Sequence, residues 1–413
     1  AVMQATRWRI PVARLDALLE RVGRAVPDAD TRDDLVARAF WHVVAEPGDA
    51  AVGVLADADA LIAGAQAMIT GCAPGDLVTL TAGELDGDAA ASALRRWTPR
   101  VRADDVVRAL EIAGRVEARL LTPLDDAWPD GLVRLGPHRP HLLWVRGRLD
   151  LAPKPGVALV GARAATGYGE HVAMELSAGL ASRDVVVISG GAYGIDGAAH
   201  RAALASQGDT IAVLAGGADR LYPSGHDALL RRVIEQGAVI SETPCGTAPT
   251  RWRFLQRNRI IAAMSDAVVV VEAGHRSGAL NTVHHALSAG VAVGVVPGPI
   301  TSAASAGCHR VLRSSEATCI TSTTDIVELA YGSPTVTEDA VLTAPSSPGA
   351  TRVRDALRPR RAQSIDELAR STGMAPHEVR AELGLLEFEQ LAIDDGDGRW
   401  RKAAPPRRDA QEF

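Results

Sequence analysis

Several residue types are scarce in this chain of 413 residues, and each scarcity narrows what the protein can be. Cysteine occurs at four scattered positions without any CxxC pair, namely Cys72, Cys245, Cys308 and Cys319. This argues against a disulfide framework or a thiolate zinc site and favours a reducing, cytoplasmic setting. No run of about 18 uncharged apolar residues is present, and the first residues lack the layout of a secretion signal, so we expect no membrane segment.

Lysine is almost missing, because Lys154 and Lys402 are the only two, and arginine therefore carries nearly all the positive charge. The net charge of −6 would by itself argue weakly against a nucleic-acid partner. The segment from Val157 to Ile320, however, is near neutral, with 13 basic and 12 acidic residues. Salt screens charges beyond roughly 8–10 Å, so a local arginine patch can still bind phosphates.

The first two regions differ in their apolar pattern. Residues 1–118 show helical spacing and predict an N-terminal helical domain. This domain loosely resembles a SAM domain. Residues 119–330 contain a strand at Leu142–Val145 and short apolar runs that recur at roughly 25–28 residues, near Val157, Val185, Thr210, Ala238, Ala267 and Val291. Runs that are apolar throughout suit strands covered on both faces, and their alternation with helices predicts an α/β fold with a doubly wound, mostly parallel sheet.

The C-terminal part begins with a predicted linker at residues 331–350, which is rich in Pro, Ser and Thr. Residues 351–403 show the order helix, helix, helix, hairpin that is typical of a winged-helix domain. Ser364 is expected to cap the second helix and to form a capping box with Glu367, three residues later. Gly373 is expected to end this helix. Residues 404–413 are predicted to be a disordered tail.

Every candidate functional stretch follows a predicted strand, so right-handed crossovers would gather them at one edge of the sheet, where ligands bind. The first stretch, VGARAATGYG, contains Gly161, Arg163, Thr166 and Gly167. We expect Thr166 to cap the next helix, whose free amides together with Arg163 would favour an anion. The alternative is that the glycines only form a tight turn.

The second stretch, SGGAYGIDGAAH, contains Ser189, which is expected to point into the crevice, and Gly190 and Gly191, which allow close backbone approach. Asp196 is expected to stabilise a helix dipole rather than act in catalysis, and His200 to be a packing residue.

The third stretch, LAGGADRLYP, adds the glycine pair Gly216 and Gly217, and its Tyr222 could line a groove. The fifth, EAGHRSGALNT, has Ser277, Gly278 and Thr282 at the start of a helix. The free amides of this helix N-terminus could also bind an anion.

The fourth stretch, TRWRFLQRNRIIAAM, is the most basic part of the chain. A helix ending near Met264 would carry four arginines within nine residues, with aromatic residues between them: Arg251, Trp252, Arg253, Phe254, Arg257 and Arg259. One interpretation is that some of these arginines form structural ion pairs. The other is that several converge with Asn258 on phosphates.

No arrangement of nucleophile and base is recognisable in the sequence. GxSxG, a catalytic Cys–His signature and paired carboxylates are all missing, and the pair His284–His285 lacks partners at ligand spacing. Neither GxGxxG nor GK[ST] is present. We therefore expect no catalysis, no metal and no cofactor, and a surface that binds a polyanionic strand.

These stretches, with ISETPCGTAP and GVVPGPITSAASAGCHRVL, run in order from about Leu120 to Leu312 and resemble the DprA (Smf) family of DNA-processing proteins. The resemblance implies an extended Rossmann-like fold that binds single-stranded DNA without catalysis. It also implies a homodimer and hand-over of the strand to RecA recombinase in natural transformation. By similarity, Arg163 grips the DNA backbone and the block Arg257–Asn258–Arg259 supports the same pocket.

Four positions depart from the commonest family form, namely Gly191, Tyr193, Ser224 and His309, so the DNA footprint is expected to differ in detail. Tyr193, Tyr222 or Trp252 could stack a base, which would give binding with little sequence preference. The third helix of the predicted winged helix is acidic, with Glu378, Glu382, Glu387 and Glu389, which opposes entry into a major groove and favours a protein contact or a weak duplex contact.

Two other functions fit parts of the pattern. One is a nucleotide phosphoribohydrolase on a related fold, although its PGGxGTxxE block and catalytic glutamate have no counterpart here. The other is a nucleotide-sensing regulator whose winged helix binds duplex DNA, against which the acidic helix argues.

Overall fold

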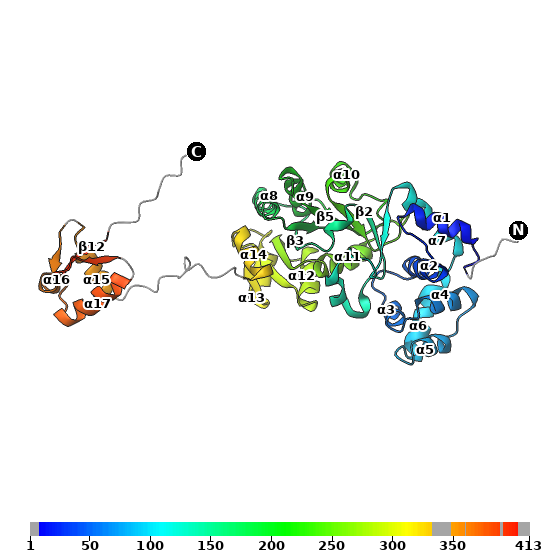
Figure 1. Cartoon of the computed structure of the whole chain (residues 1–413), viewed down its shortest axis with the longest axis horizontal. Coiled ribbons are helices and arrows are strands. Elements are labelled where there is room, and N and C mark those ends of the chain that lie inside the picture. The colour runs from blue at the N-terminus through cyan, green and yellow to red at the C-terminus, as the bar shows by residue number, and fades with distance from the viewer. Residues whose placement is uncertain (1–7, 333–347, 360, 389–390, 404–413) are drawn as a thin grey trace. The chain divides into compact units, whose positions relative to one another are not determined.

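The computed structural model describes residues 8–332, 348–359, 361–388 and 391–403. Their contacts divide the chain into two compact units, Ala1–Pro334 and Thr335–Phe413, which are described separately (Figure 1). Most of the predicted linker, residues 333–347, and the whole predicted tail lie outside the described residues. None of the helices in the described ranges is long and apolar enough to cross a membrane.

The N-terminal part of the first unit is helical, as the sequence predicts. Its helices are α1 (Val12–Arg21), α2 (Ala29–Val44), α3 (Ala50–Asp57), α4 (Leu61–Thr70), α5 (Pro74–Leu80), α6 (Gly87–Trp97) and α7 (Ala103–Arg115). Their core contains edge-on aromatic pairs, with ring centroids 5.4 Å apart for Phe40 and Trp41 and 4.8 Å apart for Trp41 and Trp97. The indole nitrogen of Trp41 donates to the Leu61 carbonyl at 2.9 Å, so the buried ring keeps a polar partner.

A nine-stranded sheet forms the rest of this unit, in the order β1-β2-β6-β5-β4-β3-β7-β8-β9. The strands are β1 (Arg119–Leu121), β2 (Leu143–Gly147), β3 (Gly156–Gly161), β4 (Val186–Ser189), β5 (Thr210–Leu214), β6 (Ala238–Ser241), β7 (Ala267–Glu272), β8 (Ala292–Val295) and β9 (Ala317–Cys319). From β6 to β9 all neighbours are parallel, which confirms the predicted mostly parallel sheet. The antiparallel β1 is not anticipated by the sequence, and it pairs with β2 at the far edge.

Helices cover both faces of the sheet, because residues on each strand alternate between two apolar cores (Figure 1). Val157 and Leu159 of β3 belong to one core, whereas Ala158 and Val160 belong to the other. One face carries α8 (Gly167–Ala181), α9 (Ile195–Ala205), α10 (Asp227–Gln236) and α14 (Thr323–Tyr331). The opposite face carries α11 (Arg251–Ala263), α12 (Ala279–Ser288) and α13 (Ala306–Ser314).

The N-terminal helices pack on the sheet layer through a short 3-10 helix, η2 (Asp130–His138). Helix α3 lies so close to η2 that a Cβ added at Gly53 would come within 1.9 Å of the Pro137 carbonyl oxygen. Arg139 next to η2 also forms an ion pair with Asp57 at the end of α3. The backbones of α3 and η2 are therefore in direct contact, and the helical part and the sheet form one compact unit.

The C-terminal unit is a small winged helix, as predicted. It contains α15 (Pro348–Ala356), β10 (Gln363–Ser364), α16 (Ile365–Thr372), α17 (Pro376–Phe388), β11 (Ala392–Asp394) and β12 (Arg399–Lys402). The predicted capping box is present, since the Ser364 hydroxyl accepts from the Glu367 amide and the Glu367 carboxylate accepts from the Ser364 amide. Gly373 ends α16 in the left-handed conformation at a φ of 69°.

We predict that Gly53→Ala destabilises the first unit by about 1–3 kcal/mol, because its new methyl group must push α3 away from η2. Gly75→Ala is the matched control, since this helical glycine has open space around its Cβ position. It should be neutral or stabilise by up to about 1 kcal/mol. Urea unfolding followed by circular dichroism measures both, and equal stabilities of the two variants would contradict the close contact.

Candidate nucleic-acid interface

A pocket of about 640 Å³ opens at the carboxyl ends of β3 and β7. The chain runs from β3 through β4 and β5 to β6 on one side, and then continues with β7 on the other side of β3. At such a reversal of strand order the following loops diverge toward opposite faces, and a crevice forms between them. The pocket is lined by Val160, Gly161, Ala162, Arg163, Ala164, Ala192, Asp196, Phe254, Leu255, Arg257, Asn258, Ile261, Gly274, Arg276, Ser277, Gly278, Ala279, Thr282, Ala303 and Ala304.

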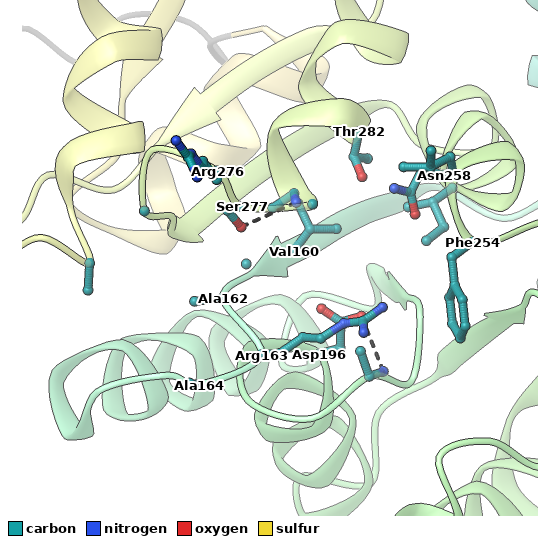
Figure 2. A pocket seen from close by; sticks show the side chains of 18 of the residues that line it. Val160, Ala162, Arg163, Ala164, Asp196, Phe254, Asn258, Arg276, Ser277 and Thr282 are labelled. Atoms are coloured by element: carbon teal, nitrogen blue, oxygen red, sulfur yellow. Dashed lines mark hydrogen bonds between the residues drawn. The ribbon is translucent and has the colours of Figure 1, made fainter. Parts of the chain in front are cut away.

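Two arginines lie beside one aromatic ring in this pocket. The guanidinium carbon of Arg163 is 5.0 Å from the ring centroid of Phe254, and that of Arg257 is 5.8 Å away. Figure 2 shows Arg163 near Asp196 on one side, and Phe254 next to Asn258 on another. Both distances allow cation–π attraction, which holds positive charge near the ring without neutralising it.

Arg257 is buried and fixed by neutral acceptors. Its Nη1 donates to the carbonyls of Gly190, at 2.7 Å, and of Val213, and its Nε donates to Asn258 Oδ1 at 3.2 Å. Its Nη2 makes no hydrogen bond within the described part of the chain. Burial lowers the pKa of Arg257 to about 10, so the group stays protonated at neutral pH. A Cβ at residue 190 would lie 2.4 Å from this guanidinium, which explains the glycine there.

Asp196 is the one carboxylate among the lining residues, and it is only 6% exposed. It accepts from the amides of Gly190 at 3.2 Å and Ala192 at 3.3 Å. Burial raises the pKa of Asp196, although the charge of Arg257 and these hydrogen bonds act in the opposite direction. The predicted stabilising position in the first turn of α9 is correct, and the carboxylate additionally holds the loop before the helix.

The opposite wall follows β7. Ser277 accepts from the Ala279 amide at 3.3 Å and Arg276 is exposed, while Thr282 is buried one turn into α12 rather than at its start (Figure 2). Asn258 donates to Asn281 at 3.1 Å and links this wall to α11. The structure thus brings together seven predicted site residues: Gly161, Arg163, Arg257, Asn258, Ser277, Gly278 and Thr282.

Sequence reasoning did not select Arg276 and Phe254 as site residues. A signal for Arg276 exists, because it directly precedes Ser277 in a loop that follows a strand. Phe254 stands among arginines in the basic stretch, but only the fold shows that Arg163, far away in sequence, packs against the same ring.

The N-terminus of α8 is not available to an anion, which corrects the expectation for Thr166 and Gly167. Thr166 does cap the helix, because its hydroxyl accepts from the Gly169 amide at 3.1 Å. The carboxylate of Glu272 at the end of β7 already lies there, however. It accepts from the Thr166 amide at 2.8 Å and from its hydroxyl at 2.7 Å. An internal carboxylate therefore satisfies the helix terminus.

Two arginines of the basic stretch form structural ion pairs instead of facing the pocket. Arg259 is 3% exposed, and its Nη2 donates to Glu242 at 2.5 and 2.6 Å. Arg253 pairs with Glu46 of the N-terminal helical part at 2.8 Å, and Glu46 also pairs with Arg100. Burial acts to raise the pKa of Glu46, but the hydrogen bonds and charges of the two arginines outweigh it and lower the pKa.

Ser189 does not point into the crevice, which corrects a second expectation. Its side chain is fully buried, and its hydroxyl donates to the Leu159 carbonyl at 2.6 Å. Gly191 follows at the same strand end, with a φ of 68° that favours glycine. At the end of β5, Gly216 and Gly217 pack against the loop that follows β6, where the Gly217 amide donates to the Thr247 carbonyl at 3.0 Å.

Exposed aromatic side chains lie beyond the pocket lining. Tyr222 is 49% exposed and packs on Phe254 with 5.6 Å between ring centroids. Tyr193 is 46% exposed, and its hydroxyl accepts from the Gly225 amide. Trp252 is 55% exposed next to the exposed Arg251 at the start of α11.

The two other positions that depart from the family form also lie in defined places. Ser224 is exposed at the start of the 3-10 helix η4 (Ser224–His226), and His309 lies in α13 with its Nε2 3.0 Å from the Gly298 carbonyl.

Comparison with known proteins adds independent findings. Residues 119–331 match the family described as DNA recombination-mediator protein A, and residues 337–394 match the DprA winged helix domain. A Mycobacterium tuberculosis protein that carries the DprA name is 49% identical over 313 residues, which cover 71% of this chain and 79% of that protein. The DNA processing protein DprA of Streptococcus pneumoniae is 39% identical over 204 residues, covering 49% of this chain and 71% of that protein.

A solved structure of DNA processing protein A from Streptococcus pneumoniae superposes with a TM-score of 0.58 at 29% identity. It covers 71% of this chain and 96% of the other, so the two chains share their architecture over most of the solved protein.

We predict that Arg257→Ala lowers the free energy of unfolding by roughly 2–4 kcal/mol, because it opens a cavity and removes the donor of two buried carbonyls. Arg163→Ala should change it by less than about 0.5 kcal/mol, since this side chain is exposed. Urea unfolding tests the pair. A destabilisation by Arg163→Ala as large as that by Arg257→Ala would contradict the distinction between a fixed and an exposed cation.

Proposed function

Because the chain belongs to the DNA recombination-mediator protein A family, we propose that it binds single-stranded DNA at the pocket beside β3 and passes the strand to RecA recombinase. The observation that carries the proposal is the charge of the pocket. Three guanidiniums, of Arg163, Arg257 and Arg276, line it with a single carboxylate, and the pKa of that carboxylate is raised. Such a pocket attracts phosphate groups. The similarity to the DNA processing protein DprA of Streptococcus pneumoniae supports the proposal that these phosphates belong to DNA.

Arg163, together with Gly161, Ser277 and Gly278, is proposed to contact the phosphates directly. Arg257 contributes positive charge from its buried position in the pocket wall, through an Nη2 that makes no hydrogen bond among the described residues. The exposed rings of Tyr222, Trp252 and Tyr193 are proposed to stack on bases, and each such stack contributes about 1–3 kcal/mol. Because every base has a flat face, the proposed binding has little sequence preference.

We propose binding without catalysis at this site. Asp196 accepts from two backbone amides, and the Cys308 thiol, which lies in the apolar core, stays protonated because burial raises its pKa to about 11. His200 is buried, contacts the Thr210 hydroxyl, and has its pKa lowered by burial to about 3. None of these groups is poised as a nucleophile or base. Release of a free base from a nucleoside monophosphate would contradict this proposal and favour a phosphoribohydrolase.

The winged helix is proposed to contact a protein rather than to carry the main affinity for DNA. Glu378 and Glu387 of α17 are exposed, whereas Glu382 is half-buried against Gly349 of α15, and Arg401 of the wing is paired with Asp395 at 2.9 Å. Glu389, also considered in the sequence, lies outside the described residues. On the family resemblance alone, we also propose that the chain acts as a homodimer.

We predict that Arg163→Ala weakens binding of an oligothymidylate and flattens the plot of log K against log salt by about 0.7, the share of one phosphate contact. Arg183→Ala is the control, because Arg183 is also exposed but lies between α8 and β4, at the amino ends of the parallel strands. Fluorescence anisotropy over a salt titration measures both. Wild-type affinity and slope in Arg163→Ala would show that the strand binds elsewhere.

Deleting residues 340–413 should leave most of the affinity for single-stranded DNA, because the proposed contacts lie in the first unit. The same anisotropy assay compares the truncated and full chains. A collapse of binding on truncation, with unfolding of the first unit unchanged, would assign the main contact to the winged helix.

A further inference from the structure

A second hollow of about 390 Å³ lies where the N-terminal helices meet the loop that follows β6. Arg100, Arg102 and Arg108 line one side of it, and residues 244–247 line the other. Asp105 is the one carboxylate in its lining. This hollow shares no lining residue with the pocket beside β3.

Two of its arginines have no internal partner. Arg100 is held by Glu46 at 2.8 Å, but Arg102 and Arg108 are exposed and form no side-chain ion pair or hydrogen bond among the described residues. Asp105 lies three residues from each of Arg102 and Arg108, and all three line the hollow. Two free guanidiniums beside one carboxylate leave this hollow with excess positive charge.

The position of Arg102 is unfavourable for the helix itself. Asp28, Asp49 and Asp86 cap α2, α3 and α6 with side-chain hydrogen bonds, whereas α7 has Arg102 at its N-cap and no such bond. A positive charge at a helix N-terminus opposes the helix dipole. Helices α1, α4 and α5 also lack a side-chain cap bond, but their N-cap residues Pro11, Ala60 and Ala73 are uncharged, so Arg102 is the one cationic N-cap among the seven described N-terminal helices. Such a departure from a local preference points to a role other than stability.

The hollow lies on the same edge of the sheet as the first pocket. It adjoins the end of β6, and three strand spacings, about 14 Å, separate β6 from β3. The intervening edge carries the glycine turns that end β5 and β4, and α11 begins directly after the loop at Arg251. The exposed Trp252 stands between that loop and Phe254 in the sequence.

Backbone amides of the loop are already occupied. The Gly246 amide donates to Asp219 at 2.8 Å, and the Thr247 amide donates to the Pro244 carbonyl at 3.2 Å. Hydrogen-bond donors for a ligand therefore come from arginine side chains. Such donors suit the repeated phosphates of a nucleic-acid backbone better than a small molecule that needs donors at several fixed positions.

We propose that the hollow lined by Arg102 and Arg108 is a second phosphate-binding site for the same single strand, which crosses the carboxyl edge from β3 to β6. The N-terminal helices would then take part in DNA binding. This inference rests on the proposed function, and it adds that the strand leaves the first pocket toward β6 and the N-terminal helices.

The test compares a dinucleotide, whose single bridging phosphate can occupy only one hollow, with a strand of about 20 nucleotides. Arg102→Ala/Arg108→Ala should bind the dinucleotide like wild type, in competition anisotropy, and bind the long strand severalfold more weakly. Its salt slope for the long strand should be shallower by about 1.4, two contacts at about 0.7 each. Arg102→Lys/Arg108→Lys should restore the slope, because lysine also neutralises phosphate.

Arg95→Ala/Arg115→Ala is the matched control, since it removes two exposed arginines from the ends of α6 and α7 outside the hollow. It should keep the wild-type slope. Wild-type affinity and slope of Arg102→Ala/Arg108→Ala, with Arg163→Ala impaired, would overturn this inference and leave the proposed function standing. If the wild type binds neither strand, the proposed function fails and this inference fails with it.

Discussion

The reversal of strand order beside β3 determines where this molecule can hold a ligand. The chain leaves β3 for α8 on one face of the sheet and leaves β7 for α12 on the other, so the two loops part at the carboxyl edge. Helix α11 closes the gap from the side and supplies Phe254 and Arg257. The hydrophobic layers that force helices onto both faces thus also create an opening lined by backbone turns and guanidiniums.

Internal carboxylates decide which cations remain available at this edge. Glu242 pairs with Arg259, and Glu46 of the N-terminal helical part pairs with Arg253. Glu272 accepts hydrogen bonds from Thr166 at the start of α8. Charge that looks concentrated in one stretch of sequence is therefore divided between structural and free positions. Arg163 forms no ion pair with a described carboxylate, and its guanidinium packs against an aromatic ring.

The sequence predicts the architecture well, because strands buried on both faces have an unmistakable apolar pattern and the caps of α8 and α16 are local signals. It also places Arg163 and Ser277 at the correct edge. It does not separate Arg257 from Arg259, although they are two residues apart on one helix. Their fates depend on partners distant in sequence, Gly190 for one and Glu242 for the other. The expectation for Ser189 fails for the same reason, since its hydroxyl donates to the Leu159 carbonyl of β3, the neighbouring strand of the sheet.

The fixation of Arg257 has a consequence for how the pocket receives a charged polymer. Its guanidinium is held by two strand-end carbonyls, so it loses little rotamer freedom when a ligand arrives and requires no reorganisation. Arg163 is exposed and can change rotamer as a chain slides past it. One preorganised cation and one adaptable cation beside the same ring would combine a constant attraction with a contact that adjusts to the position of the bound phosphate.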